Sequence, residues 1–192
     1  SDDELENFLQ ERNINFYRGP EDDLISRYII GAEMYSSETI IRLTSDCPLV
    51  DPHLINNMLS IFDNKQLDYI CNTTPPKQSS FPDGSDIEIF SINALRKANY
   101  HETDARKREH VTFQFWDNNS EYSYVTYQQE KSFSHMRYTI DNPEDIIVFN
   151  KIYKNLICAS SKFVGFEEIQ NFLEENNEIV KINEHYKPGD NW

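Results

Sequence analysis

The chain has few cysteines and no long apolar run. Both features argue against a disulfide-stabilised or membrane-spanning protein. Its 192 residues include 3 cysteines. That number is odd, and the CxxC spacing of metal and redox sites is missing, which favours buried free thiols in a reducing compartment. No stretch approaches the roughly 18–20 consecutive apolar residues of a membrane-spanning helix, and no signal-peptide pattern opens the chain. We therefore predict a cytoplasmic protein without a membrane partner.

Basic residues are scarce. Lysine and arginine total 18 against 33 aspartates and glutamates, for a formal net charge of -15. Such acidity argues against a nucleic acid polymer or an anionic membrane as partner. It leaves a single nucleotide open, because a few local cations and a metal ion suffice for its phosphates. With 38% hydrophobic residues the chain can bury a core, and its length suits one domain of roughly 100–200 residues.

Helical and β-strand patterns alternate along most of the chain. This alternation predicts an α/β fold with a mostly parallel sheet sandwiched by helices. Residues 73–85 contain three prolines and predict a long loop. The expected helices cover residues 5–12, 23–32, 51–62, 91–100, 103–116, 143–153 and 163–177, and the expected strands cover 14–17, 39–41, 68–72, 86–90, 121–128 and 137–140.

One acidic residue follows the expected strand 39–41. The strand ends in a polar turn that carries Asp46, and Asp51-Pro52 then forms a typical helix start. An aspartate at the carboxyl end of a parallel strand lies where open α/β sheets bind ligands. An ordinary capped turn is the alternative.

A second stretch repeats this pattern. Residues 137–140 are rich in β-forming residues, Asp141 follows them, and Pro143 begins a helix. Two aspartates at strand ends could converge on one metal ion at the edge of the sheet. One or two carboxylates, completed by phosphate and water, are typical ligands of Mg²⁺.

Three further motifs lie around these two stretches, in the order RGPEDDLISRY at residues 18–28, FPDGSDIEIF at 81–90 and REHVT at 108–112. Together the five motifs resemble the sugar cytidylyltransferases that activate octulosonate and nonulosonate sugars, and above all the spore-coat-polysaccharide branch of that family. The resemblance covers residues 1–157 and keeps the order of the family's motifs.

The resemblance implies a nucleotide-diphospho-sugar transferase fold of the GT-A or Rossmann-like type over residues 1–157, followed by a helical extension and tail over 158–192. It implies transfer from CTP to a sugar acceptor, giving a CMP-sugar and pyrophosphate for surface polysaccharide. Mg²⁺ or Mn²⁺ is the expected cofactor, and a homodimer is one expected assembly.

The resemblance also assigns roles to individual residues. For several of them a structural role is the alternative: helix capping for the metal-binding aspartates, a solvated strand edge for residues 83–88, and internal salt bridges for Arg42 and Arg137. The expected catalytic residues are Asp46, Asp141, Glu109 and His110, with Asp46 and Asp141 as metal ligands; the expected nucleotide-binding residues are Arg18, Asp22, Arg27 and Arg42; the expected substrate-binding residues are Asp83, Asp86, Glu88, Arg108 and Arg137.

The chain departs from the family at its start. Family members open with a hydrophobic strand and a loop of arginine, glycine and lysine that holds the triphosphate, and nothing here corresponds to it. We therefore expect an N-terminally truncated fold with a gap in the middle of the sheet. A catalytically inactive or partial member, serving as a sugar- or nucleotide-binding or assembly module, is the alternative function.

Overall fold

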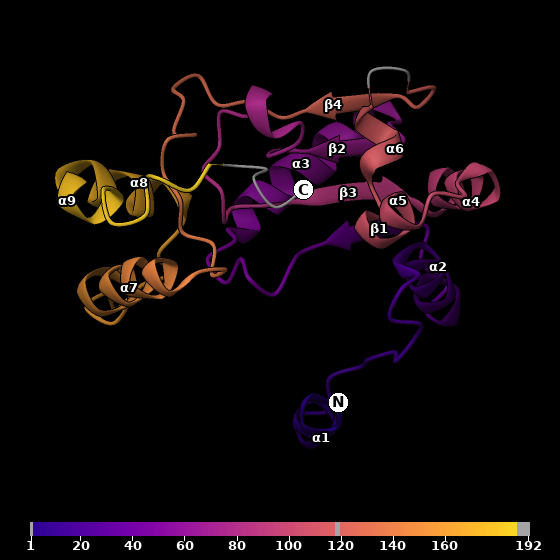
Figure 1. Cartoon of the computed structure of the whole chain (residues 1–192), viewed down its shortest axis with the longest axis horizontal. Coiled ribbons are helices and arrows are strands. Elements are labelled where there is room, and N and C mark those ends of the chain that lie inside the picture. The colour runs from indigo at the N-terminus through magenta and orange to yellow at the C-terminus, as the bar shows by residue number, and fades with distance from the viewer. Residues whose placement is uncertain (1, 118–119, 188–192) are drawn as a thin grey trace. The chain divides into compact units, whose positions relative to one another are not determined.

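The computed structural model describes residues 2–117 and 120–187 (Figure 1). Packing divides the chain into two units. The first comprises Ser1–Glu38 and Ile92–Gln114, and the second comprises Thr39–Ser91 and Phe115–Trp192. The helices that follow residue 157 belong to the second unit, and the predicted boundary between residues 157 and 158 stays a prediction.

The first unit is helical. Asp23 caps its second helix by accepting a hydrogen bond from the backbone N–H of Ser26 at 3.1 Å. Residues 14–17, expected as a strand, have no regular structure, and no described strand lies in this unit to pair with them. Helix α2 packs against α4 and α5. The helices are α1 (Asp3–Glu11), α2 (Leu24–Met34), α4 (Ile92–His101) and α5 (Ala105–His110).

The helix expected over residues 103–116 is broken in two. Helix α5 ends at His110, and Val111 follows with a φ of 63°. A positive φ is incompatible with a continuing right-handed helix. The Val111 side chain is completely buried, so burial of this residue accompanies the break. A short helix, α6 (Phe113–Trp116), comes next.

The second unit contains a mixed sheet. Strand β3 is antiparallel to β1 and β2, whereas β4 is parallel to β2. Three strands therefore run in one direction and only β3 is reversed, which confirms the α/β class. The described strands pair without interruption in the order β1-β3-β2-β4. The prediction of a gap in the middle of the sheet is therefore wrong. The strands are β1 (Thr39–Arg42), β2 (Tyr69–Cys71), β3 (Glu88–Ser91) and β4 (Tyr124–Thr126).

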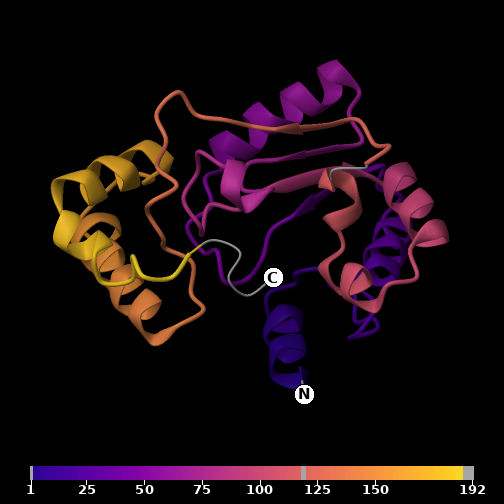
Figure 2. The ribbon, with the colours of Figure 1, turned by 45° about the horizontal axis from the view of Figure 1, so that its top comes forward.

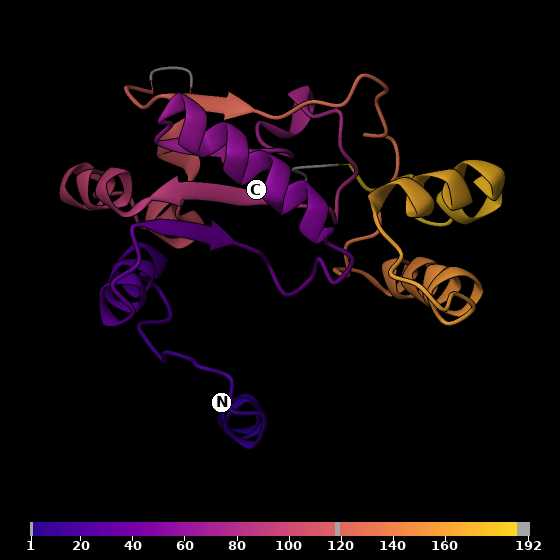
Figure 3. The same ribbon diagram turned by 180° about the vertical axis from the view of Figure 1, so that it is seen from behind.

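Helix α3 (Pro52–Lys65) crosses one face of this sheet (Figure 3). Its Met58 and Phe62 join a buried cluster with Ile70 of β2 and Ile89 of β3. Successive side chains of a strand point to opposite faces, so Tyr69 lies on the other face. There its ring stacks on Phe115 with centroids 5.2 Å apart. Both faces of the central strands are thus covered by apolar side chains.

Three C-terminal helices build a second core within the same unit. Helix α7 (Pro143–Ile152) continues into the π-helical turn Tyr153–Ile157, and α8 (Phe166–Glu175) and α9 (Asn177–Val180) follow (Figure 2). None of the described helices is long and apolar enough to cross a membrane. Their shared core contains Met136, Tyr138, Val148, Ile152, Ile169, Leu173, Ile179 and Val180.

Two expectations about local structure need correction. Residues 137–140 form no regular strand and contribute one isolated parallel bridge, from Arg137 to Asp83. The cysteines were expected to be buried, which holds for Cys47 and Cys71, but Cys158 is exposed. It follows the π-helical turn at the end of α7, where the chain leaves the core.

Candidate functional site

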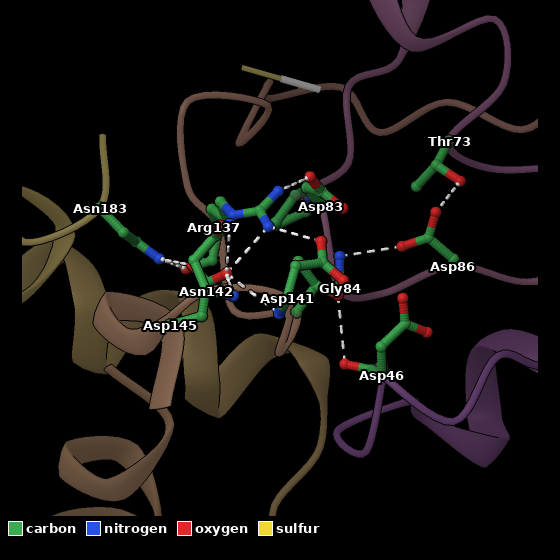
Figure 4. A network of polar contacts seen from close by, with 12 residues as sticks. Asp46, Thr73, Asp83, Gly84, Asp86, Arg137, Asp141, Asn142, Asp145 and Asn183 are labelled. Atoms are coloured by element: carbon green, nitrogen blue, oxygen red, sulfur yellow. Dashed lines mark hydrogen bonds and ion pairs between the residues drawn. The ribbon is translucent and has the colours of Figure 1, made fainter. Parts of the chain in front are cut away.

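Several acidic side chains of the second unit lie near one another (Figure 4). Asp46 lies beyond the end of β1, and Asp86 lies just before β3. Because β3 is antiparallel to β1, its beginning lies at the same end of the sheet as the end of β1. The segment that carries Asp141 joins them, since the Ile140 N–H donates to the Asp46 carbonyl at 2.9 Å.

Asp46 has an unsatisfied oxygen. Its backbone carbonyl also accepts a hydrogen bond from Thr139 Oγ1 at 3.2 Å. Its side-chain Oδ1 is buried and accepts no hydrogen bond from the described residues. Leaving a buried acceptor unpaired costs about 1–3 kcal/mol, so this oxygen is suited to accept from a water or to bind a cation.

Arg137 is the centre of an ion-pair cluster. Its side chain is 8% exposed. Nη2 donates to Asp141 Oδ2 at 2.6 Å and to Asp145 Oδ2 at 2.9 Å, and Nε donates to Asp145 Oδ1 at 3.0 Å. Nη1 pairs with Asp83. Three carboxylates thus share one guanidinium, which leaves two surplus negative charges if all three are ionised.

The pKa values in this cluster shift in opposite directions. Burial, and then the charge of Asp86, raises the pKa of Asp83 to about 7 despite its pairing with Arg137. Burial alone would also raise the pKa of Asp145, but hydrogen bonds from Arg137 and Asn183 hold it well below its usual range. The cluster therefore contains one firmly ionised carboxylate and one that protonates easily.

Asp86 is held by neutral donors. Thr73 Oγ1 donates to its Oδ1 at 2.6 Å, and the Gly84 N–H donates to its Oδ2 at 2.8 Å. Gly84 has a φ of 108°, and a Cβ there would lie 2.3 Å from the Thr139 backbone nitrogen. Only glycine fits this close approach. The turn at Asp83-Gly84 therefore fixes both Asp83 and Asp86.

Glu88 and Arg42 form a separate buried pair. Glu88 is 4% exposed; one of its carboxylate oxygens pairs with Arg42 and the other accepts from the Tyr69 hydroxyl at 2.7 Å. Both oxygens of Glu88 have protein donors, as do both oxygens of Asp86, so the expected contact of Glu88 with a sugar stays a prediction. Arg42 likewise pairs with Glu88 rather than with Asp46, four residues away.

The residues described are compatible with a cation held jointly with a substrate. Within residues 2–117 and 120–187, no group of three or more histidine, cysteine, aspartate or glutamate side chains is arranged to hold a metal ion. Mg²⁺ typically needs only one or two carboxylates when phosphates and water complete its shell. The buried unsatisfied oxygen of Asp46 and the exposed carboxylate of Asp141 fit that requirement.

Arg108, expected to contact the substrate, is instead the centre of a polar cluster in the first unit. Its Nη2 donates to Asp23 Oδ2 at 2.6 Å and to Asn99 Oδ1 at 2.7 Å, and Nη1 donates to the Glu102 carbonyl at 3.0 Å. These contacts tie α5 to the start of α2. Protein acceptors hold its guanidinium in this structure, and the expected contact of Arg108 with the substrate stays a prediction.

The other expected site residues of the first unit are more accessible. Arg18 pairs with Asp3 at 2.8 Å and Glu6 at 3.0 Å. Arg27 makes one long hydrogen bond, of 3.4 Å, to a backbone carbonyl. Asp22 and Glu109 are exposed, whereas His110 is half-buried and meets Phe113 edge-on at 5.1 Å.

Sequence reasoning missed two residues that support the site. Asp145 is completely buried and pairs with Arg137. Its position three residues after Asn142 is typical of a helix capping box, and this signal was available in the sequence. Asn183 donates to Asp145 Oδ1 at 2.8 Å. No local pattern marks it, because its partner lies 38 residues away.

Comparison with known proteins shows the family of this chain. The profile of a family described as cytidylyltransferase matches residues 1–185. The chain belongs to the cytidylyltransferase family. Cytidylyltransferases are nucleotidyltransferases, so the expected enzyme class is confirmed at the level of the family.

Individual relatives support the family. An uncharacterised Methanocaldococcus jannaschii protein, MJ1063, is 27% identical over 177 residues, which are 91% of this chain and 69% of the relative. The spore coat polysaccharide biosynthesis protein SpsF of Bacillus subtilis is 26% identical over 157 residues, 80% of this chain and 63% of SpsF. The structure of a Leptospira borgpetersenii cytidylyltransferase matches 93% of this chain with a TM-score of 0.85 and 29% identity, and 74% of that protein is covered. The chain thus spans about two thirds to three quarters of its relatives' lengths.

Proposed function

We propose that this chain carries the active site of an enzyme that transfers a cytidylyl group from CTP to a sugar. A sugar hydroxyl attacks the α-phosphorus and loses its proton, and the bond to pyrophosphate breaks. The family match over residues 1–185 carries this proposal. The similarity to a spore coat polysaccharide biosynthesis protein supports the choice of a sugar acceptor and of surface polysaccharide as the destination.

Asp46 and Asp141 are the residues that we propose to hold Mg²⁺ or Mn²⁺. Such a cation supplies charge neutralisation on the phosphate oxygens. Asp46 offers a buried oxygen that has no donor among the described residues, and one oxygen of Asp141 accepts a hydrogen bond from Arg137. Asp83 and Asp86 lie beside them and are the proposed contacts of the sugar hydroxyls. The nucleotide-binding and catalytic roles expected of Arg18, Asp22, Arg27, Glu109 and His110 stay predictions.

The proposal is tested with the complete natural protein. Pyrophosphate release from CTP is measured with acidic and polyhydroxylated sugars and Mg²⁺. We expect Asp46→Asn and Asp141→Asn each to lower kcat by about 100-fold or more, as loss of transition-state charge stabilisation does. Asp63→Asn on the exposed side of α3 is the matched control and should leave the rate unchanged.

Two outcomes would contradict the proposal. Turnover at the wild-type rate by both aspartate variants would contradict the proposed role of Asp46 and Asp141 as cation ligands. Absence of pyrophosphate with every sugar, together with measurable binding of CTP, would instead support the binding-module alternative. We place the reaction in the cytoplasm and propose a homodimer, which light scattering of the purified protein tests directly.

A further inference from the structure

We propose that Asn183, in the segment that follows α9, positions the cation ligand Asp141 through Asp145 and Arg137. Three residues would then form a chain of contacts from the C-terminal segment to the site. The inference rests on the proposed function, because it takes Asp141 as a ligand. It makes the C-terminal segment a working part of the active site rather than an extension of the domain.

The first link is the Asn183 amide. Asn183 is completely buried, and its Nδ2 donates to Asp145 Oδ1 at 2.8 Å and to the Arg137 carbonyl at 3.1 Å. Its Oδ1 is buried and has no described partner. The amide therefore satisfies its donor at the expense of its acceptor. Turning it over would place oxygen against the Asp145 carboxylate, so this orientation is fixed by charge.

The second link is the pairing of Asp145 with Arg137. Both carboxylate oxygens of Asp145 accept from the guanidinium, at 3.0 and 2.9 Å. Two-point pairing of this kind fixes the plane of the guanidinium as well as its position. Asp145 also accepts from the backbone N–H of Asp141 at 3.1 Å. The buried carboxylate of Asp145 thus fixes the position of the Arg137 guanidinium and of the main chain at Asp141.

The third link reaches the proposed ligand. Arg137 Nη2 donates to Asp141 Oδ2 at 2.6 Å, and the Asp141 side chain is 34% exposed. No described residue donates to its other oxygen, which leaves that oxygen for a ligand. Held through its main chain and one oxygen, Asp141 has little freedom to turn. Groups that orient a metal ligand in this way typically change metal affinity by about 10–100-fold when lost.

The test uses the complete protein and Mn²⁺. Free Mn²⁺ is followed by electron paramagnetic resonance during titration with α,β-methylene-CTP present, and the nucleotide alone serves as the blank. Asn183→Leu keeps the number of side-chain heavy atoms and the branching at Cγ, and it removes the donor. We expect it to weaken Mn²⁺ binding about 10-fold. Asn176→Leu is the matched control, because its Nδ2 also donates to a backbone carbonyl, that of Phe172 at 2.7 Å; Mn²⁺ affinity should not change.

A double-mutant cycle separates positioning from loss of stability. In an Asp141→Asn background, Asn183→Leu should no longer change Mn²⁺ affinity, although it should still lower the melting temperature. Asn183→Ala replaces the leucine variant if that variant does not fold. Wild-type Mn²⁺ affinity in Asn183→Leu would overturn the inference alone. Failure of the wild type to bind Mn²⁺, or unchanged binding by Asp141→Asn, would overturn the proposed cation site itself.

Discussion

Each unit of this protein contains an arginine at the centre of a polar cluster, and the two clusters differ in charge. Arg108 pairs with one described carboxylate, Asp23, and its other acceptors are neutral. Arg137 pairs with three carboxylates and is the more deeply buried of the two. A balanced cluster can be explained by stability alone. A cluster with surplus negative charge is costly unless a cation shares it, which is why the second unit is the better candidate for the active site.

Removing each arginine is the strongest way to break this comparison. Arg137→Met leaves three carboxylates without their cation, one of them completely buried. We expect a loss of about 3–5 kcal/mol in the free energy of unfolding, the usual cost of breaking a buried pair. Arg108→Met should cost about 1–2 kcal/mol, because its single carboxylate partner is partly solvated. Urea unfolding at pH 7 measures both, and an equal or larger loss for Arg108→Met would contradict the comparison.

The sequence predicted the position of this cluster better than its contacts. Asp46 and Asp141 were located because each follows a β-rich run and precedes a helix start, and such patterns are local. Arg137 was placed with the substrate or in a salt bridge, and its partner Asp83 could not be inferred because 54 residues separate the two. Contacts of that range depend on the path of the whole chain.

The errors in the fold also have physical causes. Residues 14–17 have the composition of a strand, but no described strand lies in their unit, and strand propensity alone does not provide hydrogen-bond partners. The helix over residues 103–116 was expected from an uninterrupted pattern. It breaks at Val111, whose positive φ no propensity favours. Helices with one clear apolar face, such as α3 and α8, were predicted correctly.

Replacing Asp83 by a neutral residue tests whether the Arg137 cluster carries surplus negative charge. The pKa of Asp83 in the folded protein is raised to about 7. The contribution of the protonated side chain to the free energy of unfolding is therefore fully present below about pH 4 and is lost as the pH rises through 7. Asp83→Asn is permanently neutral. The free energy of unfolding of Asp83→Asn should therefore be about 1–2 kcal/mol higher than that of the wild type at pH 8. Near pH 4 the two free energies should be equal. Thermal melting across this range, in chelator, measures the difference, and a constant offset would refute the prediction.

Asp23→Asn should give the smallest effect and the opposite pH dependence. Burial would raise the pKa of Asp23, but Arg108 and Ser26 lower it overall. The stability that its ionised form contributes is therefore present above about pH 4 and is lost as pH falls below it. Asparagine still caps α2, so the variant loses only the ion pair with Arg108. We expect this to lower the free energy of unfolding by about 0.5–1 kcal/mol at pH 7. The exposed neighbour Asp22→Asn is the matched control. If Asp23→Asn were instead stabilising and its gain grew with pH, the Arg108 cluster would carry surplus negative charge like that around Arg137, and charge balance would no longer distinguish the two units.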